Sequence, residues 1–106
     1  MNKRWLQQYD PDVAHSLEPY PDKTLIDYLA SLARESGGRP ALLFKGTKVS
    51  YAQLHRESDA FAVALAALGV RHGDRVALIL PNAPQFFLAE FGAWKLGAIV
   101  CPINPT

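Results

Sequence analysis

Hydrophobic positions recur at three- and four-residue spacing in two stretches of the chain, which predicts two amphipathic helices. The first begins at Thr24, and Asp27 three residues later suits a capping box. The second begins at Ser50, with Gln53 in the matching position, and ends before Gly69. The expected buried faces are Leu25, Tyr28, Leu29, Leu32 and Ala33 in the first helix, and Tyr51, Leu54, Ser58, Phe61, Leu65 and Leu68 in the second.

Short apolar runs bounded by turn residues predict strands. Residues 41–44 and the segment around Val49, joined by a turn over 45–48, predict a β-hairpin. Residues 75–80 predict a strand in which Arg75 is followed by an uninterrupted apolar run, as in a strand buried on both faces. Residues 98–101 predict the last strand, which we expect Pro102 to end.

Between these last two strands the pattern predicts a third helix over residues 83–96, with Asn82 as its N-cap and Pro84 in its first turn. Apolar residues cover most of its circumference, as in helices enclosed by a larger protein. Strand, helix and strand over 75–101 then make one βαβ unit with parallel strands and a right-handed crossover. The predicted fold class is α/β, with one hairpin, one βαβ unit and three helices.

Residues 1–23 show no period, and Pro11, Pro19 and Pro21 oppose helix formation. We expect an irregular N-terminal arm over 1–23, either lying across a larger body or frayed. Residues 24–106 then form an incomplete α/β segment. Two parallel strands and a hairpin cannot cover both faces of a parallel sheet, so we expect the N-terminal piece of a longer protein. Alone, such a piece should expose apolar surface or self-associate.

Composition narrows the function classes. The 106 residues carry 11 Lys and Arg against 10 Asp and Glu, a net charge of +1, which does not favour binding to nucleic acid. One cysteine excludes an internal disulfide and fits a reducing, cytoplasmic location. The chain has no apolar core of a signal peptide and no apolar stretch of bilayer length. Lys3, Arg4 and Trp5 leave open a peripheral contact with the inner face of the membrane.

We assign no catalytic, cofactor-binding or metal-ligating residue from the sequence. His15, His55 and His72 fall in the arm, on the polar side of the second helix and in a loop, without metal-ligand spacing. His72 with Arg71 and Arg75 could bind an anion, but a solvated loop is the simpler interpretation.

Packing in the protein interior is enough to account for the single cysteine and for the aromatic residues of the third helix. Cys101 lacks an activating neighbour and is expected to be a small buried apolar residue. Trp94 and the phenylalanines of the third helix could line a lipid pocket, although ordinary core packing accounts for them.

Three segments together resemble adenylate-forming (AMP-binding) enzymes. Residues 49–54 (VSYAQL) are similar to the family's Thr/Ser-Tyr-x-x-Leu motif. Residues 73–82 (GDRVALILPN) resemble its Gly-Asp-x-Val strand ending in Pro-Asn. Residues 94–105 (WKLGAIVCPINP) resemble its Lys-x-Gly-Ala-x-x-x-Pro-x-Asn-Pro segment. The resemblance covers nearly the whole chain but only about the first fifth of such an enzyme.

The leader points to one branch of this family. Trp5, Tyr9 and Pro11, followed by residues 25–28, resemble the start of bacterial long-chain fatty-acyl-CoA ligases, although Asp10 separates the usual Tyr-Pro pair. The resemblance implies a ligase that uses ATP, magnesium and coenzyme A to convert a fatty acid into its thioester through an acyl-adenylate. It places the catalytic motifs outside residues 1–106, so the segment alone should be inactive and should bind none of these cofactors.

Within the segment, the resemblance carries over only scaffold positions: Tyr51, Leu54, Asp74, Pro81 and Gly97. The expected partners are the remainder of the ligase chain and its fatty acid. Other adenylate-forming ligases, which act on aryl acids, medium-chain acids or amino acids, share these motifs and stay open as alternatives. A non-enzymatic α/β interaction module, using an exposed strand edge and the third helix, is the alternative from a different class.

Overall fold

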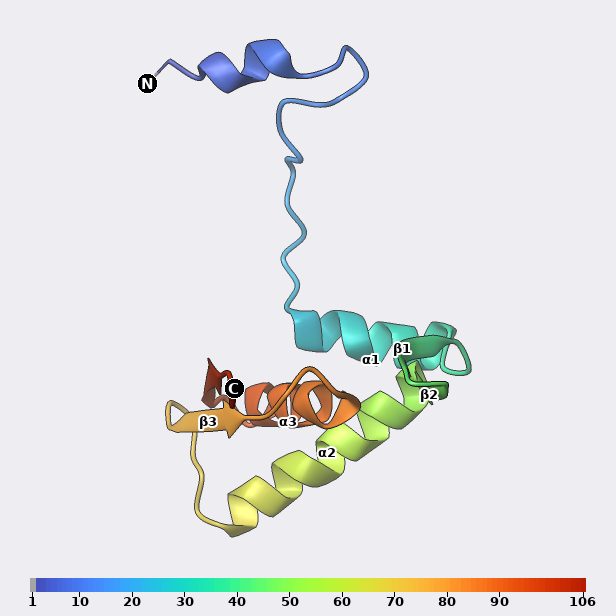
Figure 1. The fold of residues 1–106 in the computed structure, drawn as a ribbon, viewed down its shortest axis with the longest axis vertical. Coiled ribbons are helices and arrows are strands. Elements are labelled where there is room, and N and C mark those ends of the chain that lie inside the picture. Colours follow the sequence, from blue (N-terminus) through green and yellow to red (C-terminus); the bar gives the residue numbers. More distant parts are fainter. Residues whose placement is uncertain (1) are drawn as a thin grey trace.

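The computed structural model describes residues 2–106, which form an α/β body preceded by an extended arm (Figure 1). The elements are a 3₁₀ helix, three α-helices and four strands, in two separate two-stranded sheets. In chain order they are η1 (Arg4–Gln8), α1 (Leu25–Glu35), β1 (Pro40–Phe44), β2 (Thr47–Ser50), α2 (Tyr51–Ala67), β3 (Arg75–Ile79), α3 (Pro84–Lys95) and β4 (Ile99–Ile103). The predicted α/β class is confirmed.

The arm leads away from the N-terminus of α1 (Figure 1). Its one regular element is η1, a short helix within a stretch whose sequence predicts irregular structure throughout. Apart from the half-buried Leu6, every arm residue from 2 to 23 is exposed. Large apolar side chains are among them, with Leu17 80% and Tyr20 66% exposed. The arm therefore carries apolar surface that the body does not cover.

The two predicted caps at Thr24 and Ser50 form, but only one is complete. At Thr24, the side chain accepts a hydrogen bond from the Asp27 backbone N–H and the Asp27 carboxylate accepts one from the Thr24 backbone N–H. At Ser50, the hydroxyl accepts from the Gln53 backbone N–H. The Gln53 side chain instead donates to Glu57, so the reciprocal half of the expected box is missing.

The N-cap of α3 is Ala83, not Asn82 as the sequence predicted. Pro84 occupies the first turn of the helix, and a residue that precedes proline is driven into the extended region. Ala83 accordingly has φ −145° and ψ 166°, the backbone conformation of an N-cap, and no side chain caps the helix. The steric requirement of the proline therefore decides the position over the capping preference of asparagine.

The strands pair in the predicted directions, but β2 and β4 are longer than the sequence predicts. β1 and β2 form an antiparallel hairpin in which β2 already begins at Thr47, two residues before the predicted strand. β3 and β4 are parallel, with Arg75 beside Ile99. β4 continues through Pro102 to Ile103, so the prediction that Pro102 ends the strand is wrong. A proline is tolerated there because β4 pairs on one side only and its other edge needs no donor.

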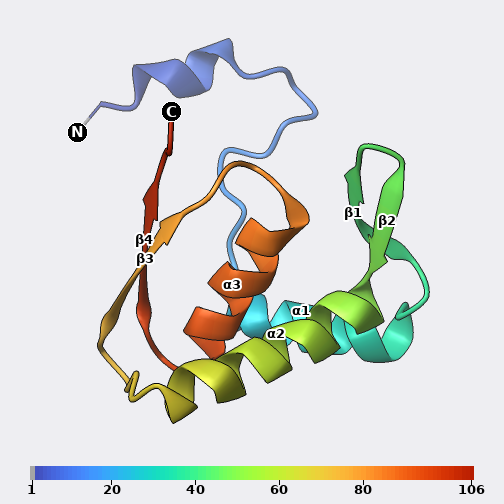
Figure 2. The ribbon, with the colours of Figure 1, turned by 60° about the horizontal axis from the view of Figure 1, so that its bottom comes forward.

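Helices α2 and α3 lie between the hairpin and the parallel pair (Figure 2). A small core of Leu29, Val49 and Leu54 joins α1, β2 and α2. On β3, only Leu78 is buried, while Ile79 is 60% exposed. The expectation that this strand is buried on both faces therefore fails for residues 2–106, in which α3 is the helix packed on β3. A buried parallel sheet needs a layer on each face.

Candidate functional site: a buried lysine between two helices

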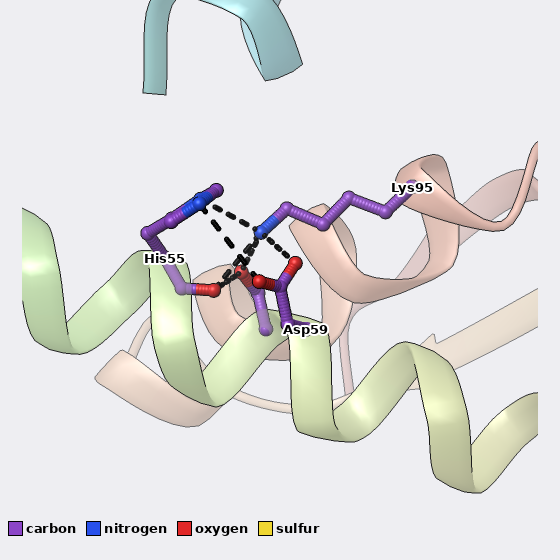
Figure 3. A network of polar contacts seen from close by, with 4 residues as sticks. His55, Asp59 and Lys95 are labelled. Atoms are coloured by element: carbon purple, nitrogen blue, oxygen red, sulfur yellow. Dashed lines mark hydrogen bonds and ion pairs between the residues drawn. The ribbon is translucent and has the colours of Figure 1, made fainter. Parts of the chain in front are cut away.

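The most concentrated polar chemistry of the described residues lies where α2 crosses α3. Lys95, in the last turn of α3, extends over α2, and its side chain is only 9% exposed (Figure 3). Its Nζ lies 2.8 Å from Asp59 Oδ1, 2.7 Å from Ser58 Oγ and 3.0 Å from the His55 carbonyl oxygen. His55 Nδ1 is a fourth neighbour at 3.1 Å. An ammonium group has three N–H donors, so these four acceptors saturate it.

The two helices can approach this closely because their contact positions are small. Ser58 is fully buried on α2, and Gly92 and Ala93 are buried on α3. A Cβ placed on Gly92 would lie 3.0 Å from the Ser58 carbonyl oxygen and 2.8 Å from Phe61 Cδ1. The glycine thus fixes the crossing, and the crossing brings α2 within reach of the lysine side chain.

Each partner of Lys95 has its hydrogen-bonding capacity arranged by its neighbours. The Ser58 hydroxyl accepts from Lys95 and donates to the His55 carbonyl oxygen at 3.0 Å. His55 Nε2 lies 3.8 Å from Asp59 Oδ2, so the imidazole also faces the carboxylate. The network therefore links three residues of one helix to a single residue of another.

Charge in this network is balanced by Asp59. The hydrogen bond from Lys95 lowers the pKa of the Asp59 carboxyl below its ordinary value, with smaller electrostatic contributions from Lys95 and His55 and an opposing contribution from desolvation. Another carboxyl group, that of Glu90 on the mostly apolar α3, has its pKa raised above the ordinary value because it is partly buried. The carboxylate of Asp59 is 57% exposed, so water weakens its attraction to the buried ammonium.

We expect Asp59→Asn to remove one pH-dependent part of the stability. A carboxyl whose folded-state pKa is lowered stabilises the fold at pH values above its unfolded pKa, and the stabilisation is lost as pH falls through the folded pKa. The difference in unfolding free energy between the original chain and Asp59→Asn should thus be constant near neutrality and shrink below about pH 4. Urea denaturation at stepped pH values measures it, and a difference that grows on acidification would contradict the assignment.

The other residues weighed from the sequence do not come together. His15 lies in the arm, where its ring packs edge-on against Tyr9 at 5.6 Å between centroids. His72 lies beside Gly97, on which a Cβ would collide with the imidazole ring. His55, expected on the polar side of its helix, is instead a partner of Lys95. The described residues, 2–106, contain no group of three His, Cys, Asp or Glu that could hold a metal ion.

The loop with Arg71, His72 and Arg75 is closed by an acidic residue. Asp74 Oδ2 accepts a hydrogen bond of 2.7 Å from the Arg71 backbone N–H. Asp74 therefore adds a negative charge to this short basic stretch, which opposes the binding of an anion there. Cys101 is only half-buried on β4, and Trp94 packs edge-on against Phe91 at 5.4 Å.

Chemically, the Lys95 network joins helices and does not present a reactive group. The ammonium is saturated and nearly inaccessible, which is unsuitable for a nucleophile or general base. The motif segments found in the sequence supply the frame around it, since residues 49–54 begin α2 and residues 94–105 run from the end of α3 through β4. Lys95 is one of the few polar residues of α3, but no local pattern in the sequence identifies Asp59, 36 residues earlier, as its partner.

Comparison with known proteins identifies the class. A sequence profile described as AMP-binding enzyme matches residues 29–106. The N-terminal subdomain of NpsA from Klebsiella oxytoca, solved in complex with anthranilyl-AMSN, superimposes with a TM-score of 0.78 at 27% identity, covering 87% of this chain and 24% of that one. The chain belongs to the AMP-binding, or adenylate-forming, enzyme family.

Curated relatives refine the comparison. The long-chain-fatty-acid–CoA ligase of Yersinia pestis is 37% identical over 106 residues, which is 99% of this chain and 19% of the relative. The crotonobetaine/carnitine–CoA ligase of Salmonella paratyphi A is 44% identical over 78 residues, which is 69% of this chain and 15% of the relative. The chain therefore spans about one fifth of the length of these relatives, and the expectation that catalytic residues lie outside it stays a prediction.

Proposed function

We propose that the chain is the N-terminal segment of a long-chain fatty-acid–CoA ligase. One observation carries the proposal: the similarity to the Yersinia pestis ligase extends over 99% of the chain, through the arm as well as the body. The AMP-binding profile begins only at residue 29, and the crotonobetaine/carnitine ligase matches 69% of the chain. The arm is thus the part of the sequence that favours long-chain ligases over other members of the family.

The proposed reaction has two steps. A fatty carboxylate attacks the α-phosphorus of ATP, forming an acyl-adenylate and releasing pyrophosphate. The thiol of coenzyme A then attacks the acyl carbon and releases AMP, leaving the thioester. ATP, magnesium and coenzyme A belong to the whole ligase. The described residues offer no cluster of metal ligands, so we assign no step of the reaction to them.

The role of this segment in the ligase is structural. It leaves apolar residues exposed, such as Ile79 on β3 and Leu43 on β1, and we expect the remainder of the ligase to pack against them. In isolation, the same surfaces would favour self-association. No helix among residues 2–106 has the length and apolar character to cross a membrane. We place the ligase in the cytoplasm, with Lys3, Arg4 and the 50%-exposed Trp5 available for a peripheral contact with the inner face of the membrane.

Assay of the full-length protein against a panel of carboxylic acids tests the proposal. We expect acid-dependent pyrophosphate release, followed by thioester formation with coenzyme A, to be fastest with long-chain fatty acids. The 106-residue chain alone should release none. Turnover confined to aryl acids, amino acids or carnitine-like acids would instead select one of the alternatives. Lack of turnover with every acid would favour the non-enzymatic interaction module.

A further inference from the structure

No further inference is drawn: the strongest candidate, the cleft at the carboxyl ends of β3 and β4 lined by Asn82, Phe86 and Asn104, lies where the remainder of the ligase is expected to pack, and nothing in the structure shows what covers it.

Discussion

Gly92→Ala is expected to force α2 and α3 apart and to destabilise the fold by about 1–2 kcal/mol. The new Cβ would lie 3.0 Å from the Ser58 carbonyl oxygen, a backbone atom that cannot rotate away, and 2.8 Å from Phe61 Cδ1. Alanine favours a helix over glycine by about 1 kcal/mol, which offsets part of the cost. Overpacking of a tight helix crossing costs up to about 3 kcal/mol, so the collision outweighs the gain.

A larger side chain makes the same test more decisive. Gly92→Leu gains a comparable helix propensity but adds three more carbon atoms to the crossing, and we expect its effect to exceed that of alanine. Hydrogen exchange of the amides in 51–67 and 84–95 locates the change at the two helices. Gly38→Ala is the matched control, since a Cβ there meets no atom within 4 Å. Unchanged protection of both helices in Gly92→Leu would contradict the close crossing.

Lys95→Met is expected to cost about 2 kcal/mol and to loosen the same junction. Methionine keeps much of the length of the side chain but removes the donors that serve His55, Ser58 and Asp59. Ser58 is fully buried, so its hydroxyl cannot recover the lost bond from water. The half-exposed Asp59 can, which keeps the loss below the 3–5 kcal/mol seen when a fully buried pair is broken.

The measurement is a double-mutant cycle with Asp59→Asn, monitored by urea denaturation. Lys95→Met should be the costlier change, and Asp59→Asn should cost much less once Lys95 is gone. Lys48→Met provides the control, since Lys48 is an exposed lysine on β2 and should change stability little. Additive effects of Lys95→Met and Asp59→Asn would show that the two side chains act independently and would refute the network.

The sequence predicts the elements of this chain well because each carries its own local signal. The spacing of apolar residues locates α1 and α2, and Thr24 with Asp27 forms the expected capping box. Local rules fail where two of them compete, as at Asn82, where the backbone requirement of Pro84 moves the cap to Ala83. They fail also at Pro102, because pairing on one side alone lets β4 continue through a proline.

The Lys95 network could not be predicted by the same means. Periodicity assigns each residue to a face of its own helix, but it does not say which face of another helix lies opposite. The sequence places His55 on the polar side of its helix, and only the crossing of α2 over α3 brings it and Asp59 to Lys95. A useful signal was present in the third helix, where Lys95 ends a mostly apolar stretch, because a lysine is almost never buried unless it is paired.

During synthesis on the ribosome, the α2 residues of this network are made before Lys95. Asp59 emerges 36 residues before Lys95, which corresponds to about two to seven seconds of synthesis. A helix forms within microseconds, so α2 can be complete long before α3 exists. During that interval Ser58, which is fully buried in the finished fold, must stay hydrated. The arrival of Lys95 then replaces that water, so the last residue of α3 completes the polar contacts that hold it to α2.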